Sequence, residues 1–192
     1  KQVRENDFPT TIRSHLFGSL MLMEVESRQQ QWRRGYQQIV GNGMDHYGIG
    51  VYQRGEIECE TSRGHDRLKP GGILIYDLTQ PFTAQTSDHL TLNLVIPRAL
   101  LEDHLQHPDD HCMRFLAPDD PMVQIIRDMV LSLQRNVCEL GHQQAQIFEK
   151  MFPTMLATCL NSVSSQTADS SHERQNILSM VKMRRYFREN LC

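Results

Sequence analysis

The sequence predicts an α+β protein in which an all-β half, roughly residues 12–97, precedes a helical half, roughly residues 119–163. Up to Pro97, short apolar runs rich in β-branched and aromatic residues alternate with turns that contain Gly or Pro, which is typical of small barrels and sandwiches. After Pro97 the apolar residues recur every three or four positions, which indicates amphipathic helices.

The clearest strand signals lie between residues 68 and 101. Lys69-Pro70-Gly71-Gly72 is a turn, an apolar run over 73–76 follows it, and a second run over 90–96 ends at Pro97. Upstream, Gly41-Asn42-Gly43 is expected to form a tight turn because Gly and Asn tolerate positive φ. We expect an N-terminal arm over 1–11, strands over 16–25, 32–40, 46–53 and 56–60, and a loop over 61–66.

In the helical half, residues 98–105 are expected to form one or two helical turns and residues 107–120 a polar loop. Asp120 and Pro121 predict a helix start, and the helix should run to about residue 138. A second helix is expected over 144–163, kinked or restarted at Pro153. Their Met-rich stripes fit either core or a dimer interface, for which the candidate contacts are Met129, Leu133, Met151 and Met155.

Bulk properties exclude several classes of protein. The chain of 192 residues has a net charge of -3, which does not indicate nucleic-acid binding by the chain as a whole. No apolar run approaches the roughly 18 residues of a transmembrane helix, so we expect no membrane partner. The five cysteines are widely spaced and form no CxxC motif, which fits a reducing cytoplasm rather than a disulfide framework.

A search for catalytic and metal-binding motifs leaves one candidate. His104, His107, His111 and Cys112 lie close in sequence, and zinc accepts both imidazole and thiolate. However, Pro108 interrupts helical spacing between them, so a solvated loop is the simpler interpretation. The chain contains no nucleophile elbow, P-loop, dinucleotide fingerprint or HExxH motif. We therefore predict no catalytic residue, no metal and no cofactor.

Three runs, residues 45–60, 68–82 and 89–102, resemble the ligand-binding domain of AraC/XylS-type transcription regulators. The residues that carry the resemblance are Pro70-Gly71 with Asp77, then Gln80-Pro81-Phe82, then Leu92, Leu94, Ile96, Pro97, Arg98 and Leu101. One departure is Gly72, where the family often has Asp. At the end of the chain, Ile177, Val181, Tyr186, Phe187, Asn190 and Leu191 resemble the first helix of the family's helix-turn-helix domain.

The resemblance implies a cupin-like, double-stranded β-helix barrel followed by a helical dimerisation segment. It assigns 12–101 to a sensor barrel, 102–163 to dimerisation and 164–192 to a linker with the start of a DNA-binding domain. The implied protein is a homodimer that binds a small-molecule effector, and promoter DNA only through helices beyond Cys192. Arg34, His46, Tyr52, Tyr76 and Asn93 are the candidate effector-binding residues, because they lie on or beside strand-like runs.

Two alternatives remain open at this point. Cupin enzymes hold a metal with an H-x-H pair, a nearby Glu and a later His, whereas this chain offers only His46, His89 and Asn93 at comparable places. A metal-dependent cupin enzyme is therefore the first alternative. The second is a scaffold that only dimerises or binds another protein.

Overall fold

A computed structural model describes residues 9–61 and 64–164. The chain divides into two compact units, of which residues 1–161 hold both β-sheets and nearly all of the helical structure. Only the end of the last helix, residues 162–164, is described in the second unit. Most of the expected arm, and all but Ser164 of the expected linker and basic helix over 164–192, lie outside the described residues.

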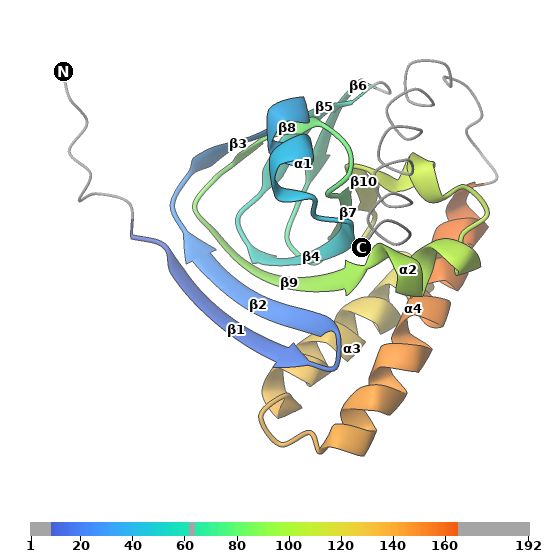
Figure 1. Ribbon diagram of the computed structural model, residues 1–192. Coiled ribbons are helices and arrows are strands. Elements are labelled where there is room, and N and C mark those ends of the chain that lie inside the picture. Colours follow the sequence, from blue (N-terminus) through green and yellow to red (C-terminus); the bar gives the residue numbers. More distant parts are fainter. Residues whose placement is uncertain (1–8, 62–63, 165–192) are drawn as a thin grey trace. The chain divides into compact units, whose positions relative to one another are not determined.

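Two antiparallel sheets face each other and form a barrel (Figure 1). The six-stranded sheet has the order β1 (Thr11–Phe17), β2 (Leu20–Ser27), β9 (His89–Pro97), β4 (His46–Arg54), β7 (Ile73–Asp77) and β10 (Arg114–Leu116). The four-stranded sheet has the order β3 (Gln30–Arg34), β8 (Phe82–Thr86), β5 (Ile57–Thr61) and β6 (Gly64–Leu68).

The expectation of one strand over 16–25 is wrong, because the chain reverses there. Gly18 has a φ of 61°, a left-handed conformation that suits glycine at the first central position of a tight hairpin turn. The turn pairs Phe17 with Leu20 and joins β1 to β2. Apolar residues occur on both sides of the turn, so the run looked continuous in the sequence.

The strand expected over 32–40 is also shorter than predicted. β3 ends at Arg34, and α1 (Tyr36–Asn42) follows. The side-chain oxygen of Gln38 accepts a hydrogen bond of 3.0 Å from the Gly35 N–H, which stabilises the first turn of α1. Gly43, with a φ of 58°, donates its N–H to the Ile39 carbonyl and ends α1. Gly41-Asn42-Gly43 therefore forms the end of a helix and not the tight turn between strands that we expected.

The strands expected from residue 46 to residue 97 are confirmed as β4, β5, β7 and β9, and so is the turn at Lys69–Gly72. Three short strands were missed. β6 begins inside the expected 61–66 loop, β8 (Phe82–Thr86) lies between the expected runs over 73–76 and 90–96, and β10 lies inside the expected 107–120 loop. β6 and β8 are largely polar and β10 has only three residues, so their pairing depends on neighbouring strands rather than on their own apolar content.

The helical half follows the prediction closely. Three short helical turns come first: α2 (Arg98–Leu101), η1 (Glu102–His104) and η2 (Pro108–His111). The long helix α3 (Pro121–Asn136) follows the capping residue Asp120, and α4 (His142–Ser164) packs beside it. The Asp120 carboxylate caps α3 by accepting from the Met122 and Val123 N–H groups. α4 continues through Pro153 without restarting. None of the described helices is long and apolar enough to span a membrane.

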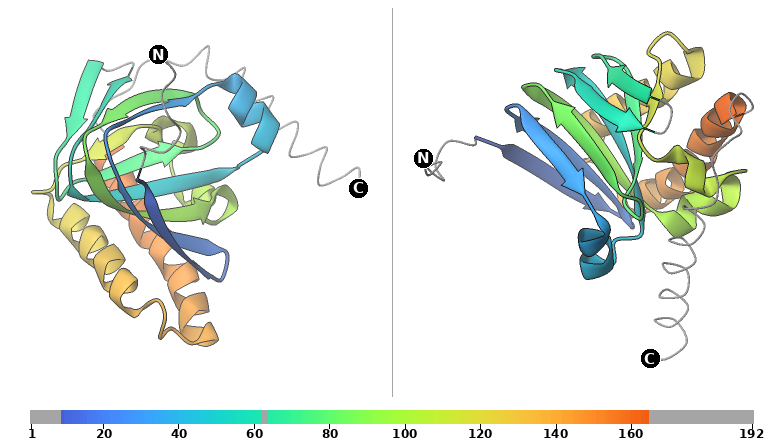
Figure 2. Two further views of the ribbon diagram at one scale, coloured as in Figure 1. Left: turned by 90° about the vertical axis from the view of Figure 1, so that its left-hand side faces the viewer. Right: turned by 90° about the horizontal axis from the view of Figure 1, so that it is seen from above.

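The six-stranded sheet has two unlike faces, and α3 and α4 lie against one of them (Figures 1 and 2). We call this the outer face; it carries Leu20, Leu22, Tyr47, Ile49, Val51, Ile73, Ile75, Leu92, Leu94 and Ile96, which share one core with Val130, Phe152 and Leu156 of the helices. We call the opposite side, which turns toward the four-stranded sheet, the inner face. Its residues are Met21, Met23, Val25, Gly48, Gly50, Tyr52, Leu74, Tyr76, Thr91, Asn93 and Val95.

Candidate functional site

Two glycines of β4 form the centre of the inner face. A Cβ atom built on Gly48 would overlap the ring of Tyr76, and one built on Gly50 would lie 3.2 Å from Asn93 Oδ1. The strand register explains this, since Tyr76 of β7 pairs with Gly48 and Asn93 of β9 pairs with Gly50. The two neighbouring side chains therefore occupy the space that larger residues on β4 would fill.

Tyr52, Tyr76 and Asn93, all predicted as effector-binding residues, lie together on this inner face. Burial raises the pKa of Tyr76 to about 12 and that of Tyr52 beyond the range of ordinary phenols, so both hydroxyls are neutral donors at physiological pH. The amide of Asn93 donates to Thr91 Oγ1 at 3.0 Å. The inner face thus combines apolar rings with a few hydrogen-bonding groups.

Arg34, the fourth predicted effector-binding residue, lies at the end of β3 opposite Phe82. Its Nε donates to the Leu78 carbonyl at 2.7 Å and its Nη2 donates to Asn42 Oδ1 at 3.1 Å. Desolvation lowers the pKa of Arg34, although the nearby Asp77 acts in the opposite direction. Arg34 therefore brings a positive charge to the end of the four-stranded sheet where α1 begins.

His46 occupies the first position of β4 and pairs with Pro97. Its Nδ1 atom is buried and has no hydrogen-bond partner among the described residues. His46 has the same strand parity as Gly48 and Gly50, so its side chain belongs to the inner side of the sheet. The structure thus places all five predicted effector-binding residues on the inward side of the barrel or at its end; whether they bind an effector stays a prediction.

The four-stranded sheet contributes the opposite wall. Ile57, Cys59, Leu68 and Ala84 are buried against Tyr52 and Leu74 of the inner face, and Phe82 packs against this cluster. Trp32 of β3 pairs with Ala84 and therefore shares its face of the sheet, but remains 45% exposed. The inward-facing side chains are therefore buried in apolar contacts at β5, whereas at β3 they remain partly accessible to solvent.

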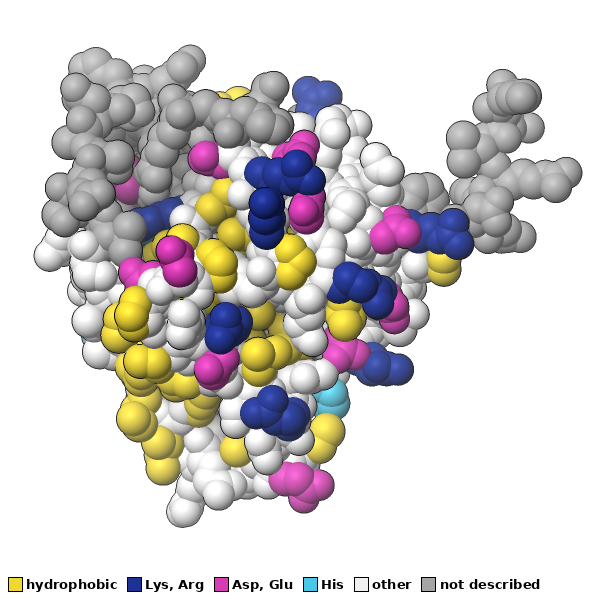
Figure 3. Space-filling view, turned by 180° about the vertical axis from the view of Figure 1, so that it is seen from behind, with side chains coloured by type: hydrophobic (Ala, Val, Ile, Leu, Met, Phe, Trp, Pro, Cys, Tyr) yellow, Lys and Arg dark blue, Asp and Glu magenta, His cyan; other side chains and the backbone are white. Residues whose placement is uncertain are grey.

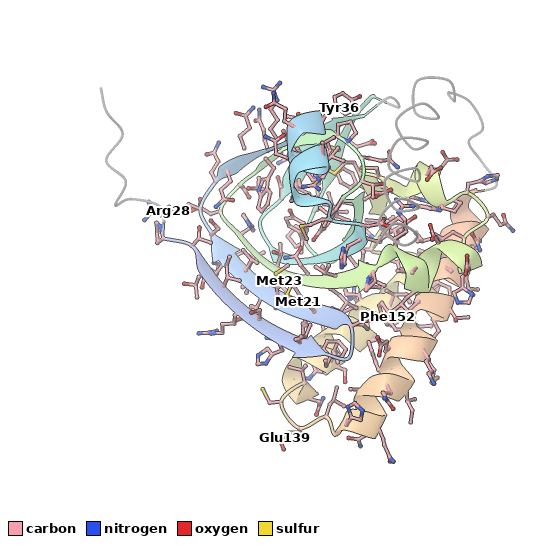
Figure 4. All side chains as sticks on the ribbon, in the orientation of Figure 1. Met21, Met23, Arg28, Tyr36, Glu139 and Phe152 are labelled. Atoms are coloured by element: carbon pink, nitrogen blue, oxygen red, sulfur yellow. The ribbon has the colours of Figure 1, made fainter. Side chains whose placement is uncertain are left out.

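The inner face is less buried than the outer face, and this contrast marks it as the candidate site. Outer-face side chains such as Leu22 and Leu94 have essentially no exposure. By contrast Met21, Met23 and Asn93 keep part of their surface accessible to solvent. Figure 4 labels both methionines on β2. An accessible apolar surface inside a barrel is where small ligands bind.

Met21, Met23 and Val25 are inner-face residues that the sequence did not single out as part of a site. Their alternation with Leu20 and Leu22 was visible in the sequence as a period of two. That period identifies two faces but not which of them meets the helices. The choice between the faces depends on α3 and α4, which lie about a hundred residues further along the chain.

The His-rich segment does not form a cluster. His111 is fully buried, and its Nδ1 lies 2.9 Å from Arg114 Nη1, while His104 and His107 are exposed. His89 lies at the start of β9, where its Nδ1 is 2.9 Å from the Ser87 carbonyl oxygen. Among the described residues, no group of three or more His, Cys, Asp or Glu side chains is placed to hold a metal ion.

The motif residues Asp77 and Arg98 form a buried polar cluster at one end of the six-stranded sheet. Arg98 pairs with Asp77 and with Asp45, donates to Tyr47 Oη at 2.7 Å, and stacks its guanidinium 4.5 Å from the centre of the Tyr47 ring. Burial alone would lower the pKa of Arg98, but Asp77, Tyr47 and Asp45 together outweigh that effect and raise it. The cluster joins the ends of β4, β7 and β9 and has the character of a structural support.

The four candidate dimer contacts fall in unlike environments. Leu133 is 4% exposed and belongs to the core under the sheet, and Met129 and Met155 are partly buried against that core. Met151 and Ile147 are each 57% exposed, and Ile125 is 47% exposed. From behind, the surface shows hydrophobic side chains interspersed with charges of both signs (Figure 3).

Comparison with known proteins identifies the family. The model of the AraC-binding-like domain matches residues 2–161. The chain belongs to this family. Its α+β fold is cupin-like, as the sequence predicted. Among curated proteins, no sequence matches the chain.

Two solved structures show the same fold at low sequence identity. The AraC-like transcriptional activator CuxR has a TM-score of 0.83 and 18% identity, over 99% of this chain and 67% of that one. The apo form of ToxT K231A from Vibrio cholerae strain SCE256 has a TM-score of 0.53 and 12% identity, over 86% of this chain and 65% of that one. About a third of each of these proteins therefore has no counterpart in the chain.

Proposed function

We propose that this AraC-binding-like domain is the effector-sensing part of a transcription regulator and that a small organic molecule binds on its inner face. The observation that carries the proposal is the contrast between the two faces of one sheet. The outer face is sealed by α3 and α4, whereas the inner face presents two glycines, two tyrosines and partly accessible methionines.

The chemistry of the inner face favours a ligand with an apolar body and a few polar groups. Met21, Met23 and the ring of Tyr76 offer apolar contact, while Asn93 and the Tyr76 hydroxyl offer hydrogen bonds. Arg34 at the end of the barrel supports a ligand that also carries a negative or strongly polar group. These groups bind and orient a molecule; they do not form a nucleophile–base pair.

The proposed mechanism is a shift between two arrangements of the domain. A ligand on the inner face changes their populations only if it binds one arrangement more tightly than the other. The alternate residues of β2 and β9 contact the helical core, so a displacement of these strands changes the packing of α3 and α4. In the proposed regulator, a homodimer passes this change to a DNA-binding domain.

A thermal-shift screen of sugars, aromatic acids and fatty acids tests the site. We expect compounds of one class to raise the unfolding temperature, because a ligand at a hundred times its Kd adds about 2.7 kcal/mol of stability. Trp32, the only tryptophan in the chain, lies on the inward face of β3 and should report binding by a change in fluorescence.

A matched pair of variants locates the site. Gly50→Leu projects a side chain toward Asn93 on the inner face, whereas Gly41→Leu in α1 meets nothing within 4 Å. Binding should be lost in Gly50→Leu and kept in Gly41→Leu. Equal binding by both variants, or no stabilising compound, would favour the scaffold alternative. Stoichiometric iron, manganese or zinc in protein purified without added metal would favour the cupin enzyme.

A further inference from the structure

β1 is the end strand of the six-stranded sheet, and its outward edge has no strand beside it in the described part of the chain (Figure 1). Ile12 and Leu16 on this strand are 60% and 76% exposed. Natural edge strands usually carry charges, prolines or bulges that discourage pairing with another chain. β1 is regular over seven residues and contains neither a proline nor a bulge; its one charged residue, Arg13, pairs with Glu24 of β2 and does not shield Ile12 or Leu16.

The hairpin geometry defines which backbone groups point to the open edge. In a two-residue hairpin the residues that flank the turn, here Phe17 and Leu20, form a hydrogen-bonded pair. Alternate residues back along β1, His15 and Arg13, therefore also direct their N–H and C=O groups to β2. The N–H and C=O groups of Ile12, Ser14 and Leu16 consequently point away from the sheet.

The strand is symmetric about Ser14 in a way that suits pairing with itself. In an antiparallel pair centred on Ser14, Ile12 of one copy lies opposite Leu16 of the other, and Arg13 lies opposite His15. A two-fold contact requires this kind of self-complementary pattern. A pairing centred on Ser14 uses the same backbone groups that the hairpin leaves at the edge. It forms two apolar Ile12–Leu16 pairs, one on each side of the two-fold axis.

We propose that β1 pairs antiparallel with β1 of a second copy of this chain, with Ser14 on the two-fold axis. The two six-stranded sheets then become one continuous sheet across the dimer. Ile12 and Leu16 share a face with Met21, Met23 and Val25, so both exposed residues are covered next to the inner face. The axis is perpendicular to the sheet, so the inner faces of both copies point to the same side.

Contacts within the domain fix both ends of β1 in place. The Ser19 N–H donates to the Glu149 carboxylate of α4 at 2.9 Å, and the Phe17 ring lies edge-on to Phe148 at 5.9 Å between centroids. At the other end, Thr10 Oγ1 is 2.7 Å from Ser27 Oγ. Fixing both ends reduces the entropy lost when a partner strand binds. A single strand pair buries a small area, so the dimer should be reversible and concentration-dependent.

This inference locates the homodimer proposed above on β1 rather than on the exposed residues of α3 and α4. A disulfide test separates the two in protein that also carries Cys138→Ser and Cys192→Ser. Ser14→Cys places a thiol opposite its own copy and should cross-link to a covalent dimer under mild oxidation, because directly paired strand residues have the Cα separation that disulfides need. Arg13→Cys would face His15 instead and should not cross-link.

Charge exchange tests the register without oxidation. Ile12→Lys combined with Leu16→Lys puts like charges opposite each other in both pairs and should weaken dimerisation about tenfold or more. Ile12→Lys combined with Leu16→Glu puts opposite charges in both pairs and should restore the dimer. Sedimentation measures association, and circular dichroism shows that each variant is folded.

Three results would overturn the proposal. They are a monomer at all concentrations, equal association of both charge variants, or a dimer abolished by Met151→Lys on α4 instead. Effector binding, measured by the thermal shift on the same proteins, is independent of these outcomes, so failure of the β1 contact is distinguishable from failure of the sensor function.

Discussion

At the scale of single residues, Arg98 shows how a buried charge is accommodated. Asp77 is fully buried, and besides Arg98 it accepts hydrogen bonds from Thr79 and from the Gln80 amide. The pair is enclosed by further polar groups, as a buried ion pair requires. The resemblance picked out both residues in the sequence, but it did not show that they contact each other.

Removing the guanidinium should strongly destabilise the fold. Arg98→Met leaves Asp77 buried without its cation, a situation that costs about 3–5 kcal/mol. Urea unfolding should show a large decrease in the free energy of unfolding. The matched control is Arg54→Met, which breaks an exposed pair with Glu26 and should cost at most about 1 kcal/mol. Similar losses in both variants would contradict the assigned role of Arg98.

The cysteines offer a second test at the same scale. Burial, with a contribution from Asp66, raises the pKa of Cys59 to about 11, whereas Cys138 is exposed. At pH 8 Cys59 is therefore mainly in the thiol form, and the thiolate is the reactive form. Alkylation followed by peptide mass spectrometry should therefore modify Cys138 well before Cys59 in the folded protein. Equal rates would show that the barrel opens readily around β5.

At the scale of elements, the sequence predicted those whose signals are local. Asp120 and Pro121 marked the start of α3 correctly, and the Pro70-Gly71 turn and the Pro97 exit were placed correctly. Two errors arose where two elements have similar composition on both sides of a boundary. Gly18 reverses the chain between two apolar strands, and Gly35 separates β3 from α1 within one amphipathic run.

The cap of α3 gives a prediction at this scale. Asp120 Oδ1 accepts from the Met122 N–H at 2.7 Å and from the Val123 N–H at 3.3 Å. Asp120→Ala removes both bonds and should cost about 1 kcal/mol of stability. The neighbouring Asp119 is exposed, so Asp119→Ala should leave the unfolding midpoint almost unchanged. A reversed order of the two effects would show that the cap is misassigned.

At the scale of the whole molecule, the α+β class and the order of barrel before helices followed from the sequence. The candidate site could be predicted only in part. Tyr52, Tyr76 and Asn93 lie on strands whose alternation was visible, but the sequence did not reveal which face is sealed by α3 and α4. That distinction depends on contacts between distant segments, and local periodicity carries no information about them.

Neighbouring residues of β2 should therefore respond differently to substitution. Leu22 is buried in the core shared with the helices, so Leu22→Ala should cost about 2–5 kcal/mol. Met23 is a partly accessible inner-face residue, so Met23→Ala should cost less stability but reduce the thermal shift produced by a ligand. The measurement is urea unfolding of both variants together with the ligand screen; a larger stability loss for Met23→Ala would contradict the assignment of the two faces.

The shared core also determines where the chain can be divided. Ile126, Val130 and Leu133 of α3 cover the same outer-face side chains that hold β2, β9 and β4 together. A fragment that ended at residue 101 would expose this apolar surface to water and aggregate, and the helices alone would have nothing to fold upon. Barrel and helices should therefore unfold in a single cooperative transition, with amides of β9 and α3 exchanging hydrogen at similar, slow rates.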